Sequence, residues 1–240
     1  MTKHNMFAAL LLLMFLVMPA ISQTHSAARE AIDKGNRRYS AGSYIEAIKE
    51  YESVGPDDVQ LYAVALYNIG VCYYELWRTT EAIGYYRRAI KQRNGSYSQA
   101  SHALGVALED EGKLQEAKAA YEQALVAANG DYPRAHYQLG LIAANAGDVQ
   151  VAAALFRKAL NRSGEHVIAS HNNLGVMLAH MHQLKEAEKQ FAIALRLSNG
   201  EFSDAAHNLN LCRRLLRRTG EAELASLRVT RTCLKSREQC

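Results

Sequence analysis

Apolar residues recur along this chain with a spacing of three and four, and polar residues fill the positions between them. From Ala63 to Tyr74 this spacing gives one apolar face on a helix, and from Thr80 to Ile90 it gives another. A turn separates the two runs. The pattern therefore predicts pairs of short helices, in which the second helix packs back on the first.

The same pattern returns every 35 residues along most of the chain. Small residues at fixed places let two helices approach closely, and the aromatic neighbours fill the space around them. So strict a period indicates a stacked array of repeats, each burying its apolar face against the next. The periodic positions are Ala47, Ala82, Ala117, Ala152, Ala187 and Ala222; Gly35, Gly70, Gly105, Gly140 and Gly175, with Asn210 in the sixth place; and Tyr51, Tyr86, Tyr121, Phe156 and Phe191.

These residues resemble the tetratricopeptide repeat, whose pattern places Leu, Gly and Tyr on one helix and Ala and an aromatic on the next. One copy here reads Leu66, Ile69, Gly70, Tyr73, Ala82, Tyr86 and Ala89. The resemblance implies an all-α fold, a right-handed superhelical α-solenoid of stacked helix-turn-helix repeats over residues 23–227. We expect five full repeats that start near residues 28, 63, 98, 133 and 168, then a degenerate capping repeat over 203–227 and a basic, cysteine-containing tail over 228–240.

The ends of the repeats depart from the family pattern. The usual proline is absent, and pairs such as Asn94-Gly95 and Asn129-Gly130 stand in its place. Both residue types tolerate the left-handed conformation that ends a helix. Trp77 and His182 occupy turn positions that are glycine in neighbouring copies, so we expect these two turns to be distorted.

The first 22 residues have a different character from the repeats. Lys3 precedes an apolar run from Met6 to Met18, and the small residues before Ser22 suit cleavage after it. We therefore predict a signal peptide over residues 1–22 and a periplasmic or secreted mature protein of a bacterial envelope. The alternative is an uncleaved membrane anchor, which requires about 20 apolar residues.

The net charge of +4 is small for the chain's length, so we expect no nucleic-acid partner. Basic residues concentrate from Arg213 onward. They are interpreted as a solvated capping helix, with contact to an anionic envelope surface as the alternative.

Cys72 and Cys212 occupy the same repeat position four repeats apart, too far for a disulfide within one chain. We interpret both as small core residues. Cys233 and Cys240 lie close together in the tail, and an oxidising compartment favours a bridge between them. An intermolecular disulfide through Cys240 is the competing possibility.

Catalytic signatures are missing from the sequence. His180 and His182 are two residues apart and so point to different faces of a helix. No metalloprotease motif, phosphate-binding loop or nucleophile elbow occurs. We predict no enzyme activity, no cofactor and no metal site.

The resemblance to tetratricopeptide arrays implies a concave groove lined by the first helix of each repeat. Asparagine and glutamine side chains on that face offer both a donor and an acceptor, so a row of them can bind the backbone of an extended peptide. We predict a scaffold that binds an extended partner segment of protein and aids complex assembly. The expected groove residues are Asn36, Tyr67, Asn68, Tyr74, His102, Tyr137, Gln138, Asn172, Asn173, His207 and Asn208.

Three alternatives stand beside this prediction. The amides could simply solvate an exposed helix face. Tyrosines at positions 39, 67, 74 and 137 could stack on sugar rings of a glycan or cell-wall polymer. The chain could also be a structural homo-oligomer.

Overall fold

The structure is a computed structural model that describes residues 25–160, 166–217 and 227–231. Every regular element within these residues is a helix, and consecutive helices pack in pairs. The predicted all-α stack of helix pairs is confirmed. The predicted signal peptide and the predicted Cys233–Cys240 bridge lie outside the described residues.

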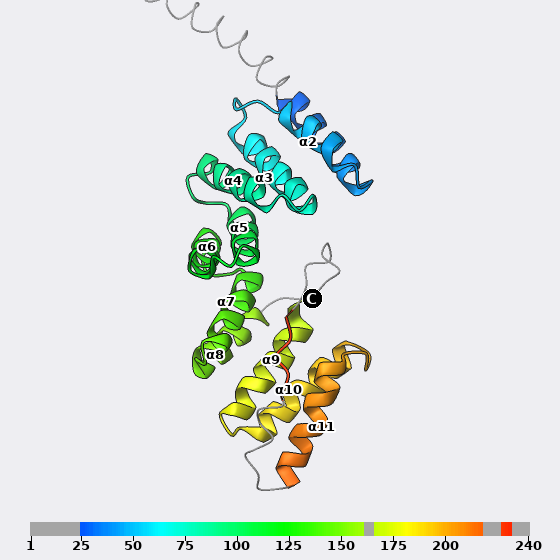
Figure 1. Ribbon diagram of the computed structural model, residues 1–240, viewed down its shortest axis with the longest axis vertical. Helices are drawn as coiled ribbons and strands as arrows, with labels where there is room; N and C mark the ends of the chain where they lie inside the picture. Colours follow the sequence, from blue (N-terminus) through cyan, green and yellow to red (C-terminus); the bar gives the residue numbers. More distant parts are fainter. Residues whose placement is uncertain (1–24, 161–165, 218–226, 232–240) are drawn as a thin grey trace, which may run out of the picture. The chain divides into compact units, whose positions relative to one another are not determined.

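The chain divides into two compact units, residues 1–117 and 118–240. Unit 1 begins with a helix over residues 25–40. It continues with α2 (Tyr44–Glu52), α3 (Val59–Glu75), α4 (Thr79–Gln92) and α5 (Ser98–Asp110), each packed on the helix before it (Figure 1). The division falls within α6 (Leu114–Ala127).

Unit 2 contains α7 (Pro133–Asn145), α8 (Val149–Ala159), α9 (His166–His180), α10 (Leu184–Leu197) and α11 (Ser203–Arg217). From α8 to α11 each helix packs on the preceding one, and α9 contacts both α7 and α11. The segment 227–231 lies beside α9 without regular secondary structure (Figure 1, red).

The periodic glycines are places of close helix contact. A Cβ atom added to Gly70 would lie 2.7 Å from the ring of Tyr86, and one added to Gly175 would lie 2.6 Å from the ring of Phe191. Tyr86 and Phe191 are themselves buried, so neither ring has space to move. The expectation that small residues set the helix spacing is therefore confirmed in both units.

The helix ends follow the predicted left-handed caps. Asn94 and Gly95 have φ angles of 51° and 83°, and the Gly95 N–H donates to the carbonyl oxygen of Ile90 at 2.9 Å. Trp77 and His182 adopt φ angles of 62° and 59°, close to those of the glycines in equivalent turns. The expectation of distorted turns is wrong, because both side chains accept the left-handed conformation without a change of turn.

One helix boundary differs from the pattern. The third helix begins at Val59 because Oδ1 of Asp58 accepts hydrogen bonds from the N–H groups of Gln60 (3.1 Å) and Leu61 (3.0 Å). The last described helix ends at Arg217, so residues 218–226 of the predicted capping repeat lie outside the description. None of the described helices has the length and apolar character needed to cross a bilayer.

Candidate functional site

Three asparagines of unit 2 are fully buried although their side chains are polar. Asn172 and Asn173 belong to α9 and Asn208 belongs to α11, and each is 0% exposed. Asn173 and Asn208 are 35 residues apart, which is one repeat, so successive first helices place them in register. A buried amide without hydrogen bonds costs about 1–3 kcal/mol, so the partners of these side chains decide their role.

The backbone of Arg228 supplies one set of partners. Its N–H donates to Oδ1 of Asn208 at 2.8 Å, and its carbonyl oxygen accepts from Nδ2 of Asn208 at 2.8 Å. Nδ2 of Asn172 donates to the same carbonyl at 2.9 Å. Asn208 also donates to Oδ1 of Asn172 at 2.9 Å, so the two amides hold each other in position.

The backbone of Thr230 supplies the second set. Its N–H donates to Oδ1 of Asn173 at 2.6 Å, and its carbonyl oxygen accepts from Nδ2 of Asn173 at 2.7 Å. The hydroxyl of Tyr137 on α7 donates to that carbonyl at 2.6 Å. Residues 228 and 230 are thus bound in the same way, and this period of two is that of an extended chain.

The side chains of the segment meet one carboxylate. Thr230 Oγ1 donates to Oδ2 of Asp204 at 2.8 Å and accepts from Nδ2 of Asn172 at 3.1 Å. Nη1 of Arg228 lies 3.7 Å from Oδ1 of Asp204. We call Tyr137, Asn172, Asn173, Asp204 and Asn208 the amide face.

Four of the predicted groove residues therefore meet around one stretch of chain: Tyr137, Asn172, Asn173 and Asn208. The sequence predicts them on an open surface, whereas the structure buries them beneath the chain's own segment. Gln138 follows Tyr137 on α7, and His207 precedes Asn208 on α11; both side chains are partly exposed.

In unit 1 the predicted groove residues have other surroundings. Asn36 is exposed, and its Oδ1 accepts from the hydroxyl of Tyr51 at 2.8 Å and from Nδ2 of Asn68 at 3.4 Å. Tyr74 is buried and donates to Asp110 at 2.5 Å. His102 on α5 is also buried.

The tyrosines considered for sugar stacking already contact protein groups. The Tyr67 ring lies 5.9 Å from that of Tyr86 and 5.6 Å from that of Tyr97, and Tyr39 donates to Glu75. Tyr137 is 1% exposed. These contacts do not favour a row of free rings for a glycan.

Sequence reasoning missed Asp204, Arg228 and Thr230. Asp204 occupies the second position of the sixth repeat, which the family pattern assigns to the groove, so completing that pattern would have found it. The two residues of the segment have no periodic signal. Arg228 is the first residue of the predicted basic tail over 228–240, and the structure places it in the extended segment 227–231.

Cys72 and Cys212 are buried free thiols, as the repeat spacing predicts. Burial raises the pKa of Cys72 to about 12 and that of Cys212 to about 11. Both thiols are protonated at neutral pH and are therefore poor nucleophiles and metal ligands.

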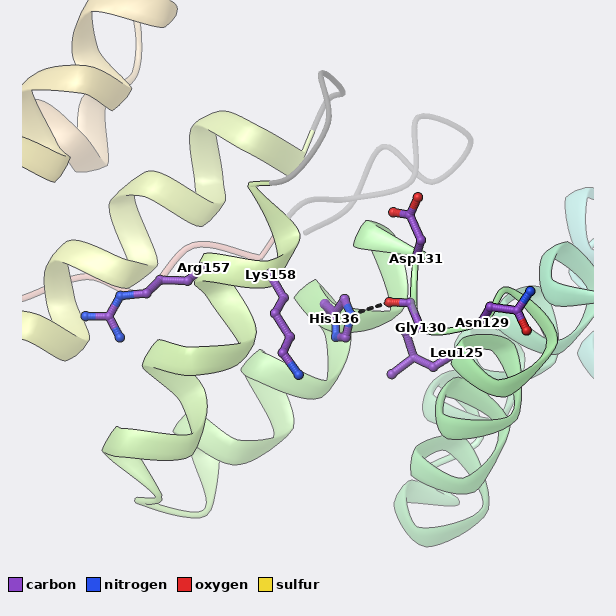
Figure 2. Close-up of a pocket in the computed structure, with 7 residues that line it drawn as sticks. All are labelled: Leu125, Asn129, Gly130, Asp131, His136, Arg157 and Lys158. Carbon is purple, nitrogen blue, oxygen red and sulfur yellow. Dashed lines mark hydrogen bonds between the residues drawn. The ribbon is translucent and has the colours of Figure 1, made fainter.

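A separate pocket of about 680 Å³ lies in unit 2, where Gly130 meets the end of α8. Figure 2 shows the charged ends of Asp131, Arg157 and Lys158 pointing away from one another, while His136 bonds to the carbonyl oxygen of Gly130 at 2.9 Å. These three charged groups do not converge on one point. Among the described residues there is also no cluster of three metal-ligating side chains.

Several solved structures share this fold. MamA matches with a TM-score of 0.57 and 23% identity, over 69% of this chain and 94% of that one. A tetratricopeptide repeat protein from Parabacteroides merdae matches with a TM-score of 0.61 and 17% identity, over 84% and 77%. YrrB, described as having an unusual peptide-binding site, matches with a TM-score of 0.57 and 21% identity, over 79% and 95%. Identities this low show a common fold.

No curated protein matches the chain in sequence. The sequence profile of the tetratricopeptide repeat matches residues 25–98 and 102–166, which is more than half of the chain. With the stacked helix pairs and the close glycine contacts, this match shows that the chain belongs to the tetratricopeptide repeat family.

Proposed function

We propose that this chain is a non-catalytic interaction scaffold of the bacterial envelope, which binds an extended segment of a partner protein on the amide face of unit 2 and so aids assembly of a larger complex. The tetratricopeptide fold supports a role in protein–protein interaction in general. The finer proposal depends on the contacts of the asparagines.

The observation that carries it is the capture of a peptide backbone by amide side chains. Asn208 and Asn173 each donate to a carbonyl and accept from an N–H of the same residue of the segment. Every residue except proline offers this pair of groups. The amide face can therefore hold an extended chain in a fixed register through its backbone alone.

The strength of these contacts suits a reversible complex. With the hydroxyl of Tyr137 and the amide of Asn172, six hydrogen bonds reach the backbone of residues 228 and 230. At about 1 kcal/mol each they contribute about 6 kcal/mol before the cost of ordering the peptide. A scaffold that exchanges partners needs such an intermediate affinity.

The envelope location is supported by the apolar run between Met6 and Met18 and the small residues before Ser22. Intact-mass spectrometry of the protein recovered from the periplasm tests it. The mass of a chain that begins at Gln23 is expected, with or without the loss of ammonia on cyclisation of that glutamine, and a full-length protein in the cytoplasm would contradict the export.

Photo-cross-linking in living cells tests the binding. A photoreactive amino acid replaces His207, which is partly exposed beside Asn208 on α11. We expect an adduct with one segment of an exported protein, mapped by mass spectrometry. The adduct should disappear when Asn172, Asn173 and Asn208 are all replaced by alanine.

The matched control replaces Asn36 and Asn68 of unit 1 by alanine, and this variant should keep the adduct. Cross-links to polysaccharide alone would favour the glycan alternative. Cross-links to a second copy of the chain alone would favour the structural oligomer.

A further inference from the structure

We propose that residues 227–231 are a built-in competitor for the amide face, and that the partner segment carries the same side-chain pattern: an apolar residue, a basic residue, any residue, then threonine or serine. This inference rests on the proposed function of that face. It adds what the backbone contacts leave undefined, namely the side chains that the face selects.

The side chain at position 230 of the segment contacts one hydrogen-bond acceptor and one donor of the amide face. Thr230 Oγ1 donates to the carboxylate of Asp204 and accepts from the amide of Asn172. Only a hydroxyl is both donor and acceptor in so small a volume. Valine, which has the same shape, would leave both partners without a bond, so the site selects threonine or serine.

At position 228 of the segment, the charge of Asp204 favours a basic side chain. The guanidinium of Arg228 lies 3.7 Å from the second oxygen of Asp204, and the Arg228 side chain is 57% exposed. A pair at this distance and exposure favours a positive charge without demanding one geometry. Arginine and lysine are therefore both accepted there, whereas an acidic side chain is repelled.

The other two positions differ in burial. Leu227 packs against the hydrophobic core cluster of unit 2, so the position before the basic residue requires an apolar side chain. Val229 lies between the two bound residues and is 38% exposed. The position of Val229 therefore accepts side chains of many kinds.

When the chain's own segment occupies the amide face, the apparent affinity of every external peptide for that face is lowered. A tethered segment has a high effective concentration near its site, and a competitor binds only to the fraction of molecules in which the site is open. A partner with the same pattern must displace the segment. The affinity measured on the intact chain is therefore lower than the affinity of the open amide face.

The test uses the full mature chain and a fluorescent, end-blocked peptide with the sequence of residues 225–232. Thr230→Pro opens the site, since proline lacks the N–H that donates to Asn173. Arg231→Pro is the matched control, because it adds the same residue one position beyond the bound pair. Fluorescence anisotropy should give Thr230→Pro a Kd about 10-fold lower than that of the wild type or the control.

Peptide variants then test the pattern on the Thr230→Pro chain. Peptides with Thr230→Val or Arg228→Glu should bind about 10-fold more weakly, because each loses a contact with a charged group. A peptide with Val229→Ala should stay within about 2-fold. If circular dichroism shows that the Thr230→Pro chain is misfolded, the Thr230→Val chain serves as a second opened form.

Each outcome separates the two proposals. Equal binding of all the peptides would overturn the side-chain pattern and leave backbone binding in place. If the wild type and both opened chains bind the 225–232 peptide with equal affinity, the proposal that the segment competes for the amide face is wrong. If no tail peptide binds an opened chain while the cross-linked partner segment does, only this inference fails; if neither binds, the proposed function fails with it.

Discussion

The two units place asparagines on the same helix face but use them differently. In unit 1, Asn36 is exposed and Asn68 is partly exposed, and one 3.4 Å hydrogen bond joins them. In unit 2, Asn173 and Asn208 are fully buried and bind the backbone of the segment 227–231. Equivalent repeat positions therefore do not have equivalent functions.

The neighbours of the asparagines explain the difference. Around the unit 1 face, tyrosines donate to carboxylates one repeat further along, as Tyr39 does to Glu75 and Tyr74 to Asp110. Polar groups there satisfy one another. In unit 2 the hydroxyl of Tyr137 instead reaches the segment, and Asp204 adds a carboxylate at its edge. A row of amides binds a peptide only where neighbouring groups leave the row available to it.

The largest expected effect comes from removing an amide in unit 2. Asn208→Ala loses hydrogen bonds to Asn172 and to both backbone groups of Arg228, so it should lower the free energy of unfolding of unit 2 by about 3 kcal/mol. Asn68→Ala in unit 1 loses one long bond and should cost less than about 0.5 kcal/mol. Urea denaturation compares the two, and similar costs would remove the contrast between the units.

Hydrogen exchange provides a local check on the same pair. The Thr230 amide should exchange about 100-fold faster in Asn208→Ala than in the wild type, because the segment detaches. In Asn68→Ala its rate should not change. Unchanged protection in both variants would show that the segment is held by other contacts.

The next effect should be equal in the two units, because their packing is shared. Gly70→Ala in unit 1 and Gly175→Ala in unit 2 each push a methyl group into a buried ring, at a cost of about 2 kcal/mol. Gly84→Ala is the matched control: no atom lies within 4 Å of its added Cβ, so the better helix propensity should stabilise by about 0.5–1 kcal/mol. A large difference between Gly70→Ala and Gly175→Ala would contradict a common framework.

A smaller effect concerns the two turns with bulky residues. Trp77 of unit 1 and His182 of unit 2 both have positive φ angles, so Trp77→Gly and His182→Gly should each raise the free energy of unfolding by about 1 kcal/mol. Gly112 has a φ angle of 75°, so Gly112→Ala should lower the free energy of unfolding. Thermal melts of the three variants measure the changes, and a loss of stability in Trp77→Gly would mean that its side-chain contacts outweigh the strain.

The smallest expected effect is a pH dependence in unit 2. Burial holds the pKa of His136 below its usual value. The unfolded chain then binds more protons than the fold does, so this contribution to stability is present above pH 6.5 and lost as the pH falls. Urea melts at pH 7.5 and 5.5 should show a smaller drop in His136→Gln than in the wild type, while exposed His180→Gln serves as control. An unchanged drop in His136→Gln would exclude this histidine as the cause.

Helix positions and turns could largely be predicted from the sequence, because they depend on near neighbours. The glycine at position 70 and the ring at position 86 lie on adjacent helices, and their spacing repeats along the chain. Asn94-Gly95 ends a helix through bonds within a few residues. The start of α3 was missed by a turn because the capping role of Asp58 does not repeat.

The candidate site was predicted only in part. Asn172, Asn173, Asn208 and Tyr137 follow from their repeat positions, and the structure brings them together. His102 has the repeat position of Tyr137 and Asn172 and is buried as they are, but it belongs to unit 1 and not to the amide face, because periodicity gives a helix face and not the neighbours that cover it. Asp204 was omitted, although its repeat position was available.

The sequence by itself determined a repeating framework of helix pairs, since each contact of that framework joins neighbouring repeats and recurs at a fixed interval. Only the tertiary structure decided what the amides hold. The bond between Asn173 and Thr230 joins residues 57 positions apart, and nothing periodic links them. A non-repeating segment finds its site through hydrogen-bond geometry and burial, and these exist only once the helices have stacked.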